Sequence, residues 1–238
     1  MSVPTVYHIG PFHIYLYGLA LATAILVGTG LTLWEARRLG LDADRLADLV
    51  LYLLTGGLLG ARLLYVLLEP GPYLANPLEI VMIQHGGLSF HGAILGGTLA
   101  GYWQIRRNRW SFWRLADLFA PTLALGYAIT RVGCDIFGAP ATVPWAVRVG
   151  GVLRHPVQLY SSLSSYLIFI LLWKLRNRTR YPGQLFLLYV ILYSASRILI
   201  EMYRVSPTLV GPVTVAQAAS LAAVAGAGLV MRLLARKA

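Results

Sequence analysis

Two histidines and a run of glycines interrupt a strongly apolar part of the chain, the segment QHGGLSFHGAILGG at residues 84–97. A plain membrane anchor would carry Leu, Ile and Val at these positions. Histidine titrates near neutral pH and can accept a proton from a nucleophile, so His91 is a candidate general base. The alternative is structural: His91 only hydrogen-bonds to a neighbouring helix. His85 lies in the preceding loop and has the weaker claim.

Three arginines are further candidate functional residues, because they fall inside apolar segments and not between them. They are Arg62, Arg131 and Arg197. An arginine at the centre of a membrane helix costs about 2.5 to 3.5 kcal/mol on insertion scales, and such residues usually face the bundle interior or a wet cavity. The alternative is that these side chains lie near the interface and only snorkel towards water.

An anionic phospholipid headgroup is the ligand that these arginines predict. Arginine stays charged in a dry site and holds phosphate through paired hydrogen bonds. Glu201 lies four residues after Arg197 and therefore on the same helix face. Its carboxylate would hold the Arg197 guanidinium in a fixed orientation, or it would only neutralise that charge.

The elements that must position these residues are membrane helices. Of the 238 residues, 58% are hydrophobic and 12% are charged, whereas a soluble domain carries about 25% charged residues. A bilayer core needs roughly 20 mostly apolar residues per helix. We expect an all-α integral membrane protein, one polytopic domain at residues 1–238, with the first helix retained because no signal-peptide cleavage site follows it. Seven segments qualify as transmembrane helices: residues 14–34, 46–68, 88–105, 115–133, 157–173, 184–203 and 213–234.

The basic residues predict the orientation of these helices, because cytoplasmic loops are enriched in Lys and Arg. On one side lie fourteen: Arg37, Arg38, Arg45, Arg106, Arg107, Arg109, Arg114, Lys174, Arg176, Arg178, Arg180, Arg232, Arg236 and Lys237. The opposite side carries only Arg148, Arg154 and Arg204. We therefore expect the N-terminus outside and the C-terminus in the cytoplasm. This topology accounts for the net charge of +11 without a nucleic-acid partner.

The predicted topology gathers polar residues that are scattered through the sequence into one layer near the outer leaflet. The members of this layer are Tyr17, His91, Arg131, Cys134, His155, Gln158, Tyr160, Arg197 and Glu201. Ser161, Ser162 and Ser165 continue a polar stripe along the fifth predicted helix. The layer is the expected functional site.

Two connections on the outer side are longer than tight turns, and we expect ordered extracytoplasmic loops at residues 69–87 and 134–156. The first contains the amphipathic run LEIVMIQ, which we expect to lie on the membrane surface. Glycines at GxxxG spacing, Gly56 with Gly60 and Gly92 with Gly96, predict close approaches between helices.

Cys134 is the only cysteine, so an intrachain disulfide is excluded. The chain contains neither HExxH nor CxxC, and we expect no metal or organic cofactor. Cys134 has two interpretations: a small apolar filler at a helix end, or a thiol that nearby Arg131 activates as a nucleophile or acceptor.

Several stretches resemble motifs of the bacterial prolipoprotein diacylglyceryl transferase family, in the family's order along the chain. They are YG at 17–18, GARLLYV at 60–66, SFHG at 89–92, RVG at 131–133, RHPVQLY at 154–160 and RILIEMYR at 197–204. Several spaced motifs together are far more specific than any one of them.

The resemblance implies a seven-helix enzyme that moves the diacylglyceryl group of phosphatidylglycerol onto the thiol of a lipobox cysteine in a preprolipoprotein. It assigns His91 as the base, Arg131 and Arg197 to the phosphate, Glu201 to the orientation of Arg197, and Tyr17 as a hydrogen-bond donor. The further residues implied in substrate binding are Arg62, Cys134, Gly138, His155, Gln158 and Tyr160.

The sequence departs from the family pattern around the expected headgroup site. Cys134 stands where the family usually carries an asparagine, Gly138 aligns with a later glycine of the family, and Ser161 replaces a glutamate. These differences leave two alternatives open. The first is a relative that uses phosphatidylglycerol with another acceptor; the second is a non-catalytic anionic-lipid-binding or transport protein.

Overall fold

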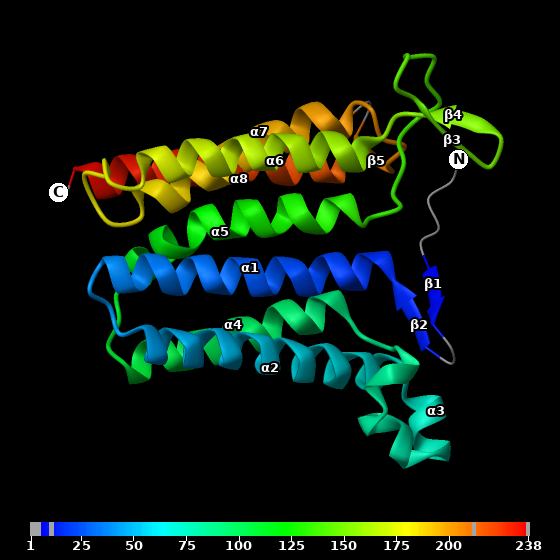
Figure 1. The fold of residues 1–238 in the computed structure, drawn as a ribbon, viewed down its shortest axis with the longest axis horizontal. Coiled ribbons are helices and arrows are strands. Elements are labelled where there is room, and N and C mark those ends of the chain that lie inside the picture. The colour runs from blue at the N-terminus through cyan, green and yellow to red at the C-terminus, as the bar shows by residue number, and fades with distance from the viewer. Residues whose placement is uncertain (1–5, 10–11, 211–212, 237–238) are drawn as a thin grey trace. The chain divides into compact units, whose positions relative to one another are not determined.

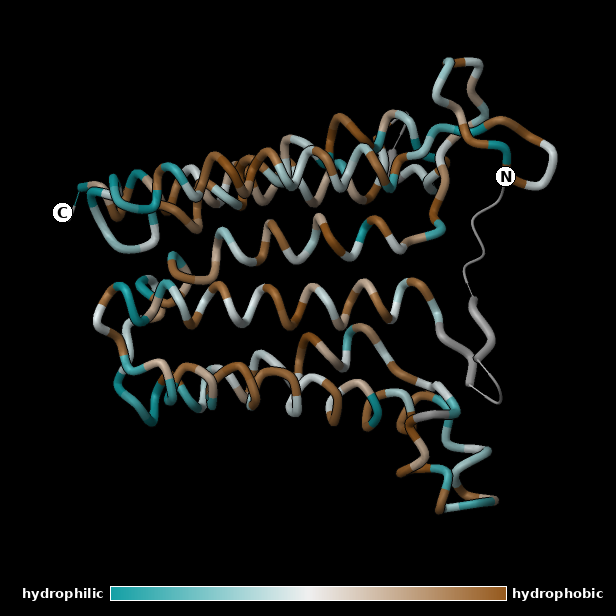
Figure 2. The backbone as a smooth tube through the Cα atoms, in the orientation of Figure 1, coloured by the Kyte–Doolittle hydropathy of each residue, from teal (hydrophilic) through white to brown (hydrophobic). Residues whose placement is uncertain are grey.

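Seven helices of 18 or more residues make up most of the described chain, which in this computed structural model comprises residues 6–9, 12–210 and 213–236. Each corresponds to one of the seven predicted segments (Figure 1). They are α1 Leu16–Arg38, α2 Ala43–Leu68, α4 Phe90–Arg107, α5 Phe112–Val132, α6 Val157–Leu175, α7 Gln184–Glu201 and α8 Val215–Ala235. Hydrophobic residues run along the middle of these helices, and hydrophilic residues gather at their ends and in the connections (Figure 2).

Four of the helices, α1, α2, α7 and α8, are long and apolar enough to cross a membrane. The prediction of an integral membrane protein built from helices is therefore confirmed. The number of crossings and their orientation stay predictions. The helix ends differ from the predicted ones by a few residues. The largest difference is at α1, which continues to Arg38, where the Arg38 Nη2 atom pairs with the Glu35 Oε1 atom at 2.5 Å.

Three small antiparallel hairpins lie outside the all-α prediction: β1 (Val6–Ile9) with β2 (Phe12–Tyr15), β3 (Val147–Val149) with β4 (Val152–Arg154), and β5 (Thr208–Val210) with β6 (Val213–Thr214). The β3–β4 turn is Gly150–Gly151, with φ of 56° and 84°. Two-residue hairpin turns of this kind need positive φ, which glycine adopts without steric cost. Strands this short carry too little alternation to be predicted from hydropathy alone.

The loop at residues 69–87 contains three short helices: α3 (Pro70–Ala75), η1 (Pro77–Val81) and η2 (Ile83–His85). Leu74, Leu78 and Val81 are 80%, 67% and 72% exposed. Exposed apolar side chains on short helices suit the predicted position on a membrane surface. That position stays a prediction.

The chain divides into two compact units: residues 33–112, and residues 1–32 together with 113–238. In the 33–112 unit, α2 and α4 approach so closely that a Cβ on Gly60 would collide with the carbonyl oxygen of Gly92. A Cβ on Gly56 would lie 2.5 Å from the Cβ of Ala100. The close approach predicted from the GxxxG spacing is therefore confirmed, and it fixes the start of α4, where His91 lies.

In the unit of residues 1–32 and 113–238, a buried cluster joins α5, α6 and α7 through Ala120, Ala124, Ile168, Leu172 and Leu185. Asp117 of α5 caps the beginning of α7. Its Oδ2 atom accepts a hydrogen bond from the Gly183 amide at 2.6 Å, and its Oδ1 atom accepts one from the Phe186 amide at 2.9 Å. Because the first amides of a helix lack partners within the helix, this contact fixes α7 against α5.

Candidate active site

Glu201 is the centre of a cluster of arginines at the end of α7. Its side chain is almost fully buried, and its Oε2 atom lies 3.2 Å from Nη2 of Arg197 and 3.6 Å from Nε of Arg204. Thr214 donates a hydrogen bond from Oγ1 to the Oε1 atom of Glu201 at 3.4 Å. One carboxylate oxygen of Glu201 is therefore within ion-pair distance of two guanidinium groups.

Positive charge exceeds negative charge in this cluster. Burial lowers the pKa of the Arg204 guanidinium below its usual range, and the neighbouring charges of Arg197 and Arg131 lower it further, whereas Glu201 raises it. Like charges lower the pKa of a cationic group because they destabilise its charged form. Three arginines thus share the field of a single carboxylate, so an anion brought to this place would be stabilised.

Arg131, in the last turn of α5, presents unpaired donors. Its Nη1 atom donates a hydrogen bond to the Sγ atom of Cys134 at 3.3 Å. Its Nε and Nη2 atoms are buried, and the described residues give them no hydrogen-bond partner. A buried donor without a partner costs about 1 to 3 kcal/mol. An anion that accepted hydrogen bonds from these two nitrogens would recover that cost.

The first turn of α1 lies against the chain that follows Arg131. A Cβ on Gly133 would lie 2.7 Å from the carbonyl oxygen of Leu16 and 2.8 Å from the Cβ of Ala20. The absence of a side chain at Gly133 therefore permits this approach. Tyr17 is in the same turn of α1, and its side chain is half exposed. The helical turn that carries Tyr17 therefore lies beside the RVG motif at residues 131–133. This proximity is required if Tyr17 and Arg131 belong to the same site.

Gly138 is a crossing point of the backbone. Its amide donates to the carbonyl oxygen of His155 at 2.8 Å, and its carbonyl oxygen accepts from Nη1 of Arg154 at 3.2 Å. A Cβ on Gly138 would collide with the carbonyl oxygen of Tyr203 and would lie 2.7 Å from Cγ1 of Val157. Gly138 therefore shapes the site by joining three segments.

His155 and Tyr160 belong to an aromatic group together with Tyr203 and Trp145. The His155 and Tyr203 ring centroids are 5.0 Å apart, and the indole nitrogen of Trp145 donates to the Tyr160 hydroxyl oxygen at 2.7 Å. The same hydroxyl lies 3.2 Å from Nδ1 of His155. Because the indole can only donate, the phenol is free to donate its own hydrogen to Nδ1. The Tyr160 hydroxyl therefore links the side chains of Trp145 and His155.

Three residues of the polar layer and stripe predicted on α6 are buried. Gln158, Ser161 and Ser165 are 7%, 3% and 1% exposed. Ser161 donates a hydrogen bond from Oγ to the Val157 carbonyl oxygen at 2.8 Å, whereas the buried Oε1 atom of Gln158 has no hydrogen-bond partner among the described residues. Gln158 is therefore the member of the stripe with an acceptor to offer to a ligand.

His91 is the second residue of α4 and is exposed. The helix begins at Ser89, whose side chain accepts a hydrogen bond from the Gly92 amide at 3.3 Å and whose own amide donates to the Ala61 carbonyl oxygen at 3.0 Å. The cap and the backbone contact with α2 fix the position of His91. Its ring meets Phe90 edge-on, at 5.9 Å between centroids.

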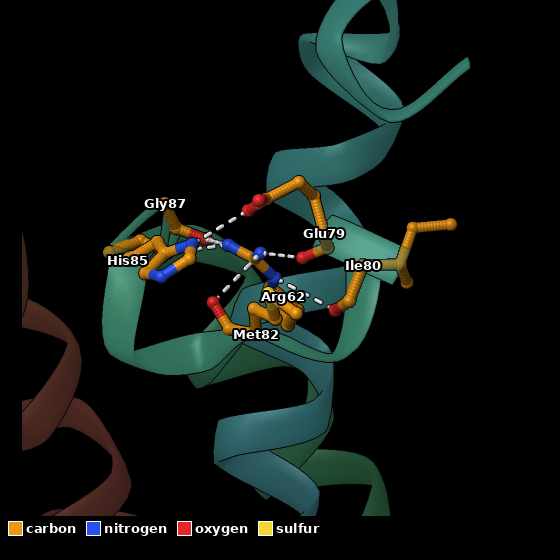
Figure 3. A network of polar contacts seen from close by, with 7 residues as sticks. Arg62, Glu79, Ile80, Met82, His85 and Gly87 are labelled. Carbon is orange, nitrogen blue, oxygen red and sulfur yellow. Dashed lines mark hydrogen bonds and ion pairs between the residues drawn. The ribbon is translucent and has the colours of Figure 1, made fainter. Parts of the chain in front are cut away.

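Arg62 has a different setting from that of Arg131 (Figure 3). All five of its N–H groups can be matched to backbone carbonyl oxygens of the loop at residues 79–87, which belong to Glu79, Ile80, Met82, Gly86 and Gly87. The guanidinium also lies over the Tyr73 ring, 5.0 Å from its centroid. A guanidinium has five N–H donors, so none is left for a phosphate. The structure thus gives no support to the predicted role of Arg62 in substrate binding and makes it the anchor of this loop.

Two members of the cluster were not among the predicted site residues. Arg204 was expected only as a loop charge, although its spacing of three residues from Glu201 was a signal for a contact. Thr214 begins α8 with a capping box, in which Gln217 is the reciprocal partner, and the T-x-x-Q spacing predicts such a cap. Among the described residues, no three His, Cys, Asp or Glu side chains gather as a metal site would require.

Comparison with known proteins gives consistent matches along nearly the whole chain. Residues 4–233 match the family model described as prolipoprotein diacylglyceryl transferase. Three similar proteins are each named phosphatidylglycerol–prolipoprotein diacylglyceryl transferase. The one from Synechococcus elongatus is 40% identical over 93% of this chain and 84% of its own length. The one from Nostoc sp. is 38% identical over 93% and 86%, and the one from Bacillus cytotoxicus is 35% identical over 90% and 85%.

Proposed function

Because the chain belongs to the prolipoprotein diacylglyceryl transferase family, we propose that it transfers the diacylglyceryl group of phosphatidylglycerol to the lipobox cysteine of a preprolipoprotein. Its family membership confirms the resemblance found in the sequence. Membership also favours a transferase over the lipid-binding or transport alternative. The partners of the proposed reaction are phosphatidylglycerol and a lipobox-containing preprolipoprotein.

The proposed reaction exchanges one bond for another. The cysteine sulfur attacks the carbon of the diacylglyceryl group that is bonded to the phosphate oxygen. A C–S thioether bond forms, and the bond between that carbon and the phosphate oxygen breaks. The thiol proton passes to a base, and glycerol phosphate leaves with the electrons of the broken bond. Negative charge therefore grows on the departing phosphate, and catalysis requires fixed positive groups beside it.

The arginine cluster is the observation that carries this proposal. Arg131, Arg197 and Arg204 outnumber the single carboxylate of Glu201, and two nitrogens of Arg131 are buried without a hydrogen-bond partner among the described residues. A phosphate would supply the missing acceptors and the missing negative charge. Its charge rises as the C–O bond breaks, so these contacts strengthen in the transition state.

The other residues take the following proposed roles. His91 is the base for the thiol proton, and Tyr17 donates a hydrogen bond to the lipid headgroup. Glu201 orients Arg197. Residues that shape or line the headgroup site are Cys134, Gly138, His155, Gln158 and Tyr160.

The proposed setting is the bacterial cytoplasmic membrane, with the site open to its outer leaflet. The chain would cross the membrane seven times, with its N-terminus outside. The support is the distribution of Lys and Arg between alternate connections and the occurrence of one long helix in each predicted segment. The loops at residues 69–87 and 134–156 would then lie outside the cytoplasm.

A transfer assay tests the proposal. Purified protein in detergent receives phosphatidylglycerol with a labelled diacylglyceryl group and a peptide that contains a lipobox cysteine. We expect label on the peptide through a bond stable to hydroxylamine, and loss of transfer in His91→Ala and Arg131→Ala. A folded wild-type protein that transfers no label to the peptide would overturn the proposal. Transfer to a different thiol instead would support the alternative with another acceptor.

A further inference from the structure

We propose that Tyr127 is a positioning residue that sets the guanidinium of Arg131 and, through Tyr193, its spacing from Arg197. The inference rests on the proposed function, because it concerns the two arginines that would hold the phosphate. It adds a residue to which neither the motifs nor the proposed chemistry assigns a role.

The chain contains the same short pattern in two helices. YAITR at residues 127–131 of α5 and YSASR at residues 193–197 of α7 each place a tyrosine four residues before an arginine. Residues four apart lie on the same face of a helix. Each arginine therefore stands one turn beyond a tyrosine.

The two tyrosines meet each other. The ring centroids of Tyr127 and Tyr193 are 5.2 Å apart, with an interplanar angle of 87°. This is the edge-to-face arrangement that aromatic pairs prefer. The Cζ atom of Arg131 lies over the Tyr127 ring, 5.6 Å from its centroid, within the range in which a ring face attracts a guanidinium. Tyr127 thus contacts both the arginine of its own helix and the tyrosine of the other.

The two patterns lie at the same level, because a second contact fixes the register of the helices. Asp117 of α5 binds the Gly183 amide at the start of α7. Tyr127 is ten residues beyond Asp117, Tyr193 is ten beyond Gly183, and α5 and α7 run in the same direction (Figure 1). Ten helical residues rise by about 15 Å. The tyrosines are thus brought level, and the arginines follow four residues later on both helices.

The ring of Tyr127 makes the contacts with both Arg131 and Tyr193. Its face holds the Arg131 guanidinium, and its contact with Tyr193 keeps the helix turns of Arg131 and Arg197 at a fixed separation. A fixed pair of guanidinium groups can contact the same phosphate without reorganisation during the reaction. Loss of the ring would leave Arg131 tethered by its contact with Cys134.

The experiment compares Tyr127→Phe, which keeps the ring, with Tyr127→Leu, which removes it. We expect the Phe variant to keep kcat within about threefold of wild type, and the Leu variant to lower kcat about tenfold, in line with the strength of a partly desolvated cation–π contact. The KM for phosphatidylglycerol should change less than kcat, because the contacts strengthen as the phosphate leaves. Tyr166→Leu on α6 is the matched control and should behave as wild type.

A double-mutant cycle separates positioning from general packing. With Arg131→Lys in the background, Tyr127→Leu should cost clearly less activity than it does alone, because the ring acts through the guanidinium. Equal costs in both backgrounds would overturn the inference, as would equal loss in the Phe and Leu variants.

If Tyr127→Leu reduces the yield of folded protein, Tyr127→Met supplies similar volume without a ring face, and the same comparison applies. If the wild type is active and the Leu or Met variant is unaffected, only this inference is contradicted. If folded wild-type protein is inactive, the proposed function itself is contradicted.

Discussion

The Nη1 atom of Arg131 donates a hydrogen bond to the Sγ atom of Cys134 over 3.3 Å. Sulfur is a weak acceptor, whereas the amide oxygen of asparagine is a strong one. The family that the sequence resembles usually carries asparagine at this position. The chain therefore holds the central arginine of its proposed phosphate site with a weaker contact than an asparagine could provide.

Substitutions of Cys134 should follow the strength of the acceptor at this position. We expect Cys134→Asn and Cys134→Ser to keep kcat/KM within about threefold of wild type, because both retain an acceptor for Arg131. Cys134→Val removes the acceptor, and we expect kcat/KM to fall about tenfold, near the value of a hydrogen bond to a charged group. The measurement is the transfer assay with the lipobox peptide.

The same set of variants tests the interpretation of Cys134 as a nucleophilic or acceptor thiol against the contact in the structure, in which its sulfur accepts a hydrogen bond from Arg131. If the thiol itself attacks the lipid or accepts it, Cys134→Ser and Cys134→Asn must both lose transfer, because neither offers a comparable nucleophile. If it only accepts from Arg131, the Ser and Asn variants stay active and Val alone is impaired. Mass spectrometry of the wild-type protein after turnover provides the control, since an acceptor thiol would carry the diacylglyceryl group.

Replacement of Glu201 by Gln should unbalance the arginine cluster. Removing one partner of a buried ion pair costs about 3 to 5 kcal/mol, and the partial exposure of Arg197 and Arg204, at 22% and 18%, reduces this to about 1 to 3 kcal/mol. We expect a lower Tm for Glu201→Gln and at least a tenfold lower kcat/KM, because Arg197 loses its orienting partner.

Lipid composition checks the electrostatic origin of that loss. Phosphatidylglycerol should raise the Tm of Glu201→Gln more than phosphatidylcholine does. The reason is that an anion neutralises the positive charge that the substitution leaves unbalanced. Glu79→Gln is the matched control: its partner His85 is 55% exposed, and exposed pairs contribute little. Equal stabilisation of Glu201→Gln by both lipids would contradict an anion site at the cluster.

The sequence predicted the helices and missed the small hairpins, for a physical reason. Helices of 18 or more apolar residues have a strong hydropathy signal. The glycines at GxxxG spacing predicted close approaches between helices, and the structure has one between α2 and α4. The β3–β4 hairpin has only three residues in each strand. Its one visible signal was the Gly150–Gly151 pair at the turn, which is too short a pattern to define a fold.

The candidate site was predictable as a set of residue types and was not predictable as a set of contacts. Arg62 and Arg131 have the same signature in the sequence, an arginine within an apolar helix. Arg62 donates hydrogen bonds to backbone carbonyl oxygens of a loop that lies up to 25 residues after it in the sequence. Arg131, in contrast, keeps two buried nitrogens without partners among the described residues. Which of these outcomes occurs depends on how the loop folds back, and no local pattern encodes that.

Arg62→Lys should loosen the loop at residues 79–87 while leaving lipid affinity unchanged. A lysine ammonium has three donors in place of the five of the guanidinium, so at least two carbonyls lose their partner. A hydrogen bond to a charged group contributes about 1.5 to 3 kcal/mol, and we expect amide hydrogen exchange in this loop to accelerate at least tenfold. The KM for phosphatidylglycerol should stay within about twofold of wild type, because no N–H of Arg62 is left for phosphate.

Arg45→Lys is the matched control for this experiment. Arg45 forms an ion pair with Asp42 in which the two side chains are 64% and 50% exposed, and such pairs are worth little. Exchange in the loop should be the same as in wild type for this variant. A rise in the KM of Arg62→Lys with unchanged loop exchange would restore the predicted role of Arg62 in substrate binding.

Gly138→Ala should destabilise the protein, although it adds a single methyl group. The new Cβ would collide with the Tyr203 carbonyl oxygen, which accepts a hydrogen bond from the Ala139 amide at 2.9 Å, and would lie 2.7 Å from the buried Val157. Neither neighbour can withdraw without breaking a hydrogen bond or disturbing the core. Overpacking of this kind costs about 1 to 3 kcal/mol, and we expect a lower Tm with reduced transfer.

A glycine in open space separates this effect from the general effect of adding a methyl group. Gly226 lies within α8, and a Cβ on it would meet no neighbour within 4 Å among the described residues. Gly226→Ala should therefore leave the Tm unchanged or raise the stability by up to about 1 kcal/mol. Because Gly138 joins the backbones of His155 and Tyr203, its substitution should lower kcat through displacement of the His155 ring. An unchanged Tm combined with a higher KM for phosphatidylglycerol would instead show that the lipid contacts Gly138 directly.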